Sequence, residues 1–307
     1  MTMIKHVLGV GISAKPGNPD LSEFARNLDH VQGFGVDTIE LPTYDLDLLA
    51  GGRIRKGQLA ALKGICAHRD VTYTVHGPLA INFFDVPYRN QRHFEILQAS
   101  VEVAAELGAI HYVMHSGLIG VTQHDGLEEA YARQREWLAR AGEFAQQHNM
   151  ILCVENLFGG YEGKVHAASP SRLARELAAV GHSHVMATLD FSHAYLNLSF
   201  TGGDLVSECA ALAPFAKHLH VHDSFGRQDD IWMFTQGERL AYGHGDLHLP
   251  VGWGDIAWEA LMASCIFPQG VVFNIELQDR YWHVGQECVD ATKTLAAKAR
   301  TTLAVAA

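Results

Sequence analysis

Short apolar runs rich in β-branched residues alternate with longer amphipathic stretches along the whole chain. The short runs have the length and composition of buried strands, and the longer stretches have the period of helices. Eight strands are predicted, at His6–Ile12, Asp37–Leu41, Val71–His76, Ile110–His115, Ile151–Glu155, Val185–Asp190, His218–His222 and Gly270–Glu276. The main helices are predicted at Leu21–Gly33, Leu59–His68, Gln91–Leu107, Gly126–His148, Ser169–Ala179, Ile256–Cys265 and Val284–Ala304.

This regular alternation predicts one α/β domain, a (β/α)8 TIM barrel that spans residues 1–307. No linker or low-complexity segment interrupts the series of strands and helices. The longest insertion, Gly226–Tyr242, carries the apolar residues Trp232, Met233 and Phe234. It is interpreted either as a lid or as a subunit contact in a homo-oligomer.

Composition and charge narrow the range of functions. A formal net charge of −11 disfavours a nucleic-acid partner, and no apolar run approaches the roughly 18 residues of a membrane span. The 5 cysteines are scattered without a C-x-x-C pair, and the start of the chain lacks a signal-peptide cleavage site. A cytoplasmic protein is therefore expected. The 19 histidines beside 23 Lys and Arg are unusual and direct attention to metal binding.

Residue types that bind metals stand at the predicted strand ends. The chemistry of a TIM barrel lies at the C-terminal ends of its strands. Strands three to eight end in or near such residues: His76, His115, Glu155, Asp190 with His193, His220 with the loop residues Asp246 and His248, and Glu276. Buried carboxylates and imidazoles at this density are costly unless a cation lies among them. The sequence therefore predicts a divalent metal site.

Each of these residues also has a structural explanation when it is taken alone. His76 and His115 precede glycine turns, and Glu155 with Asn156 could cap the next helix. His218 and His222 share a face with His220 because strand side chains alternate. Together with Asp223 they are candidates for orienting the ligands. If no metal binds here, all of these structural explanations must hold at once. A single shared cation is therefore the simpler explanation.

Seven segments carry a resemblance to a known family: VHGPLAINF, VMHSG, CVEN, LDFSHA, HVHDS, GDLHLPVGWGDI and FNIEL. Together they resemble the xylose-isomerase-like TIM barrels, which include sugar epimerases, inosose dehydratases, hydroxypyruvate isomerase and endonuclease IV. The resemblance implies a ligand set of His76, His115, Glu155, Asp190, His193, His220, Asp246, His248 and Glu276. The single-metal sugar enzymes of the family would use Glu155, Asp190, His220 and Glu276.

The implied activity is a metal-dependent isomerase or epimerase that acts on a sugar-like ketone through an enediolate, with Glu155 and Glu276 as acid and base. The alternatives are a zinc-dependent endonuclease IV-like phosphodiesterase and a related lyase or dehydratase. One to three divalent ions are expected, and Zn, Mn, Co, Fe and Mg all remain open. Arg227 and Arg280 are candidates for binding a phosphate or carboxylate group of the substrate. An equally good interpretation is that both are ordinary surface arginines. Trp253 is a further candidate for substrate binding, and it is a candidate for shaping the pocket together with Glu40, Phe83 and Trp282.

Overall fold

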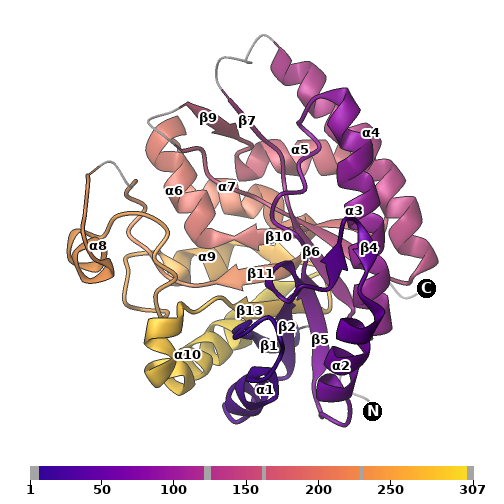
Figure 1. The fold of residues 1–307 in the computed structure, drawn as a ribbon. Helices are drawn as coiled ribbons and strands as arrows, with labels where there is room; N and C mark the ends of the chain where they lie inside the picture. The colour runs from indigo at the N-terminus through magenta and orange to yellow at the C-terminus, as the bar shows by residue number, and fades with distance from the viewer. Residues whose placement is uncertain (1–6, 121–125, 161–163, 229–230, 303–307) are drawn as a thin grey trace.

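The structure, a computed structural model, describes residues 7–120, 126–160, 164–228 and 231–302. Eight parallel strands form a closed barrel in the order β1-β13-β11-β10-β8-β6-β5-β2 (Figure 1). Their bounds are β1 Val7–Ser13, β2 Thr38–Pro42, β5 Thr72–His76, β6 His111–His115, β8 Ile151–Glu155, β10 Val185–Asp190, β11 Ala216–Val221 and β13 Val271–Ile275. The predicted (β/α)8 barrel is confirmed, with each predicted strand found near its predicted place. His6, where the first strand was predicted to begin, lies outside the described residues.

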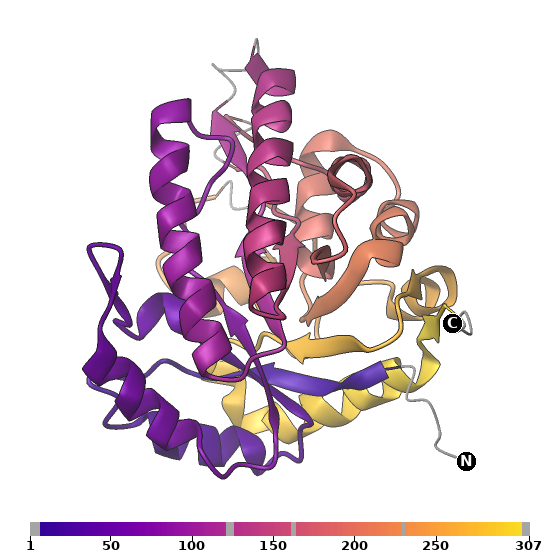
Figure 2. The same cartoon turned by 90° about the vertical axis from the view of Figure 1, so that its right-hand side faces the viewer.

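The helices surround the strands, as the view in Figure 2 shows. They are α1 Phe24–Gln32, α2 Lys56–Cys66, α3 Pro87–Glu106, α4 Leu127–Gln147, α5 Pro170–Val180, α6 Phe191–Thr201, α7 Leu205–Leu212, α8 Gln236–Tyr242, α9 Trp258–Ser264 and α10 Gly285–Lys298. The pattern did not predict α6, α7 and α8. Helix α6 is apolar on most sides and begins directly at the end of β10, so it shows no amphipathic period.

The loops between the barrel strands and the helices contain shorter elements. Among the described residues, short 3-10 helices are η1 Thr43–Asp45, η3 Ala213–Phe215 and η4 Asp279–Val284. Small two-stranded sheets pair β3 Leu49–Ala50 with β4 Arg53–Ile54, β7 Leu118–Gly120 with β9 Val165–Ala167, and β12 Ile266–Phe267 with β14 Arg300–Thr301. Within the described residues, no helix is long and apolar enough to cross a membrane.

The insertion after β11 contains helix α8, which stands away from the barrel in Figure 1. Trp232 and Phe234 are 84% and 82% exposed, so these two rings do not pack against the barrel in this conformation. The predicted roles of the insertion as a lid or a subunit contact both remain predictions.

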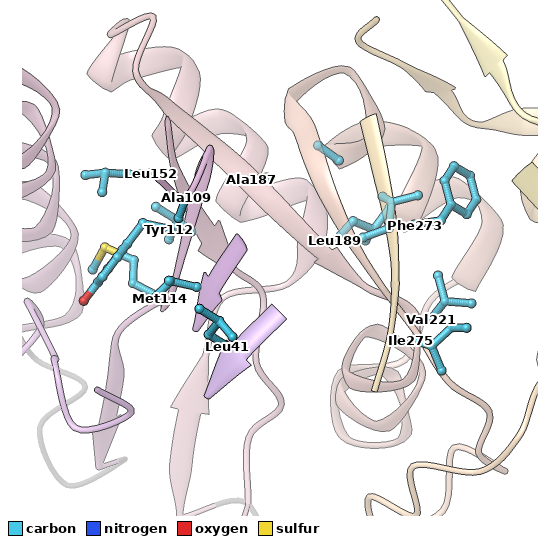
Figure 3. Close-up of a cluster of buried hydrophobic side chains, with 14 of the residues drawn as sticks. Leu41, Ala109, Tyr112, Met114, Leu152, Ala187, Leu189, Val221, Phe273 and Ile275 are labelled. Atoms are coloured by element: carbon cyan, nitrogen blue, oxygen red, sulfur yellow. The ribbon is translucent and has the colours of Figure 1, made fainter. Parts of the chain in front are cut away.

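Side chains alternate between two environments along each barrel strand. Leu189, Val221 and Ile275 belong to the hydrophobic cluster between the strands and the helices (Figure 3). Their sequence neighbours Asp190, His220 and Glu276 must point the other way because strand side chains alternate. The alternation that packs one set of side chains against the helices therefore places polar side chains in the barrel interior, near one end.

Candidate metal centre

Four side chains that are far apart in the chain meet at the C-terminal end of the barrel. Glu155 ends β8, Asp190 ends β10, His220 lies in β11 and Glu276 follows β13. One ligand atom from each of these residues lies within 4.8 Å of the others. We call these four residues the central group. The convergence that the sequence predicted is therefore present.

His220 lies among the three carboxylates of the central group. Its Nδ1 is 3.1 Å from Glu155 Oε1, 3.4 Å from Glu276 Oε2 and 3.7 Å from Asp190 Oδ2. One ring nitrogen carries at most one proton, so it cannot donate hydrogen bonds to all three carboxylates at once. Ligands about 2.1 Å from a shared tetrahedral ion are about 3.4 Å apart, and the observed separations match that spacing.

Two further groups flank the central group. In the first flanking group, the Nε2 atoms of His76 and His115 lie 3.3 Å and 3.7 Å from Glu155 Oε2. The second flanking group comprises His193, Asp246 and His248. Asp246 Oδ2 lies 3.2 Å from His193 Nε2 and 2.8 Å from His248 Nε2.

All nine residues that the sequence proposed as ligands therefore fall into the three groups, and Glu155 belongs to two of them. Their role as metal ligands remains a prediction.

His222 joins the site although the sequence assigned it no ligand role. Its side chain is buried, and Nε2 lies 3.0 Å from Asp190 Oδ2. The imidazole stacks on that of His248 with a centroid distance of 4.1 Å, and His222, His248 and Glu276 form a further group that could hold an ion. The signal in the sequence was its spacing of two from His220, which puts both rings on one face of the strand.

The strand ends are fixed by a reciprocal pair of hydrogen bonds. Asn156 Nδ2 donates to the Asp190 carbonyl, and Asn156 Oδ1 accepts from the Asp190 amide, both at 2.9 Å. Asp190 also caps α6, because its Oδ1 accepts from the His193 amide at 2.7 Å. This leaves Oδ2 of Asp190 facing the imidazoles. Asn156 was noted in the sequence only as a helix cap, and here it joins β8 to β10.

The charges at the site depend on one another. Burial tends to raise the pKa of Glu155, but the nearby His220, His193 and His76 outweigh it and hold that pKa well below its usual value. Burial tends to lower the pKa of His248, but Asp246 raises it to about 9. His115 differs, because burial is the larger influence and lowers its pKa to about 4. Carboxylates and protonated histidines thus stabilise one another where no other cation is present.

Across the described residues, the ion-pair partners of the site carboxylates are all histidines, and none is Lys or Arg. Of the site's side chains, Glu155 and His222 each have a buried atom, Oε2 and Nδ1, that is among those of the described residues without a hydrogen-bond partner. Buried polar atoms nearly always have a partner. Carboxylate oxygens and imidazole nitrogens in this arrangement fit a divalent cation of the Zn, Mn, Co or Fe type.

Residues 28–294 match the sequence profile of the xylose isomerase-like TIM barrel family. The chain belongs to this family. No curated protein matches it in sequence.

Solved structures with the same fold include a D-tagatose 3-epimerase-like protein, 18% identical with a TM-score of 0.70, where the match covers 94% of this chain and 98% of the other. D-psicose 3-epimerase with D-tagatose, from Clostridium cellulolyticum H10, is 16% identical with a TM-score of 0.65 and coverage of 94% and 99%. A Thermus thermophilus protein soaked with ZnCl2 is 20% identical with a TM-score of 0.66 and coverage of 95% and 99%. At these identities the similarity concerns the fold.

The three residues proposed to bind substrate lie outside the ligand groups. Arg227 is exposed, and its Nη1 donates to the Tyr242 carbonyl at 3.0 Å. Arg280 is also exposed and lies over the ring of Tyr281, 5.4 Å from its centroid. Trp253 is 43% exposed and packs edge-on against Tyr281 at 5.5 Å. Their role in substrate binding remains a prediction.

Asp223, which the sequence offered as a candidate for orienting the ligands, accepts hydrogen bonds from the turn that follows His248. Its Oδ2 accepts from the Gly252 amide at 2.8 Å and from Trp258 Nε1 at 3.1 Å, and its Oδ1 accepts from the Ile256 amide at 3.3 Å. A Cβ on Gly254 would lie 2.3 Å from Asp223 Oδ1, so only glycine lets this turn close on the carboxylate. Asp223 thereby anchors the turn that follows His248.

Proposed function

We propose that this chain is a divalent-metal-dependent isomerase or epimerase of a ketose or a closely related sugar-like ketone. The observation that carries the proposal is the central group, in which two glutamates approach one histidine with no Lys or Arg as an ion-pair partner among the described residues. Family membership supports a sugar substrate, because several solved structures with this fold are sugar 3-epimerases.

The four residues of the central group would hold the ion. A bound divalent cation polarises a carbonyl and its neighbouring hydroxyl, and so makes the adjacent C–H bond more acidic. The chain itself must supply the groups that remove and return that proton. The carboxylates of Glu155 and Glu276 are the candidates, because they come from different strands and both lie beside His220 Nδ1.

The two glutamates differ in access to solvent. The Glu276 side chain is 15% exposed, whereas that of Glu155 is 1% exposed. Glu276 is therefore the more solvent-accessible of the two carboxylates. In this proposal a sugar bound between them would present opposite faces to Glu155 and Glu276. Removal of a proton by one and delivery by the other gives epimerisation. Transfer by a single carboxylate between adjacent carbons gives aldose–ketose isomerisation.

Solvent exchange tests the proposal. Protein loaded with Mn²⁺, Co²⁺ or Zn²⁺ is incubated in D2O with D-tagatose, D-psicose, D-fructose and L-ribulose, and deuterium uptake is followed by proton NMR. We expect exchange at a carbon beside the carbonyl of at least one ketose, and loss of exchange after treatment with a chelator. Absence of exchange with every ketose and every ion would contradict the proposal.

One observation favours a second candidate, a zinc-dependent phosphodiesterase. The central group and the two flanking groups together provide enough ligands for as many as three ions. Such a cluster would suit the stabilisation of a phosphate in a displacement reaction. Zinc-dependent cleavage of a duplex that contains an abasic site would support this function, and an intact duplex at high protein concentration would remove it.

A further inference from the structure

Glu40 is a buried residue of β2 and is not one of the nine predicted metal ligands. Its Oε1 accepts a hydrogen bond from Ser13 Oγ at 2.9 Å and another from Asn274 Nδ2 at 3.1 Å. Asn274 Nδ2 also lies 2.8 Å from Ser13 Oγ, so these donors from β1 and β13 form one cradle around Oε1. One half of the carboxylate is therefore held in place by the neighbouring strands.

The other oxygen of Glu40 faces two imidazoles. Oε2 lies 3.5 Å from His220 Nε2 and 3.1 Å from His218 Nε2. His218 in turn approaches His111 across the barrel, with 3.4 Å between their Nδ1 atoms. Glu40 thus connects His220 to a buried row of side chains inside the barrel.

His220 is consequently shared between two environments. Its Nδ1 faces the carboxylates of the central group, whereas its Nε2 faces Glu40 on the opposite side of the ring. A neutral imidazole has one nitrogen that donates a proton and one that offers a lone pair. A carboxylate that accepts from Nε2–H therefore leaves the lone pair on Nδ1, where the cation would bind.

We propose that Glu40 is a positioning residue that fixes the tautomer and the ring orientation of His220 for metal binding. The inference rests on the metal site of the proposed function, but it does not depend on the sugar. Both oxygens of Glu40 face donors, and among the described residues its ion-pair partners are histidines with no Lys or Arg. This environment suits a carboxylate that accepts hydrogen bonds. Removing it should weaken cation binding without removing a ligand.

The experiment compares metal binding by the wild-type protein, Glu40→Leu, Glu40→Gln and the matched control Thr74→Val. Thr74 is buried and pairs with Glu40 in the register of β2 and β5, and its hydroxyl has no hydrogen-bond partner among the residues that the structure describes. Metal-free proteins are titrated with Zn²⁺ against a competing chelator, and with Co²⁺ while the visible spectrum is recorded. Thermal melts of the metal-free proteins show whether each variant is folded.

We expect Glu40→Leu to bind Zn²⁺ about 100-fold more weakly, with an altered Co²⁺ spectrum and the same number of ions per chain. Glu40→Gln should bind about 10-fold more weakly, because an amide must turn its NH2 toward donors on one side or the other. This variant keeps the size of the side chain and tests the inference if the leucine variant fails to fold. Thr74→Val should retain wild-type affinity and spectrum.

Wild-type affinity and spectrum in folded Glu40→Leu, or in Glu40→Gln where the leucine variant does not fold, would overturn the inference. Loss of one whole ion per chain would also overturn it, since Glu40 would then be a ligand. A wild-type protein that binds metal tightly but exchanges no ketose proton would refute only the proposed sugar chemistry. A wild-type protein that binds no metal would refute both proposals.

Discussion

Replacement of Glu276 by glutamine removes a group that can transfer a proton while leaving the shape of the site nearly unchanged. Glutamine has nearly the same volume, and the Glu276 side chain is partly exposed, so the barrel should fold normally. The backbone carbonyl of Glu276, which lies 3.1 Å from His248 Nδ1, is unchanged by the substitution. Three members of the central group, Glu155, Asp190 and His220, also remain.

The expected loss follows from the two roles of the Glu276 carboxylate. A well-placed general acid or base contributes about 10²–10⁴-fold to a rate, which corresponds to about 2.7–5.5 kcal/mol in the activation free energy. Glu276 Oε2 lies 3.4 Å from His220 Nδ1, so the loss of its charge should also weaken cation binding. Metal must therefore be saturating before rates are compared, so that the remaining loss reports proton transfer alone.

The assay is deuterium uptake into the ketose that the wild-type protein exchanges fastest, with metal content measured in each sample. Glu287→Gln is the control, because Glu287 lies exposed on α10 and takes no part in the ligand groups. We expect Glu276→Gln to exchange about 10²–10⁴-fold more slowly and the control to match the wild type. Exchange by metal-saturated Glu276→Gln within about threefold of the wild-type rate would refute the assignment, since that is far below the contribution of a general base.

Two further predictions concern protons and stability. Because the pKa of His248 is raised to about 9, its imidazole is in the charged, doubly protonated form at pH 7, and cation binding there should release one proton. Calorimetry in buffers of different ionisation enthalpy should detect this proton release, and binding should tighten as pH rises toward 9. Zero proton release would contradict the assignment of His248 as a metal ligand. Asp223→Ala should lower the free energy of unfolding by about 3 kcal/mol in urea, because several buried donors lose a charged acceptor. The control Glu259→Ala removes an exposed ion pair with Lys298 and should lower the free energy of unfolding by less than about 1 kcal/mol. Equal losses of stability in the two variants would show that the turn does not depend on Asp223.

Local patterns were sufficient to predict the barrel. A period of two marks the strands because alternate side chains pack on the helices, and Ile275 beside Glu276 shows this alternation clearly. A carboxylate that closes an apolar strand, as Glu155 does, could be recognised as a site residue for the same reason. Closure of the barrel then brings such strand ends together, so the convergence of the nine candidates followed from the topology.

The features that sequence reasoning missed depend on contacts between distant strands. Glu40 and His220 are 180 positions apart, and no local pattern shows that their side chains meet. Asp223 likewise acts through amides more than 25 residues further along the chain. Helix α6 escaped prediction because it is buried on most sides, which removes the polar face that marks an amphipathic helix. These features become visible only when the register and the closure of the barrel are known.

The location of a bound cation tests the account most directly. Crystals of protein purified without chelators and supplied with Zn²⁺ or Mn²⁺ can be measured on both sides of the absorption edge of the metal. We predict an anomalous peak among Glu155, Asp190, His220 and Glu276, within bonding distance of His220 Nδ1. Fully occupied cations elsewhere in the protein with no peak at these four side chains, or no bound cation at all, would contradict the account.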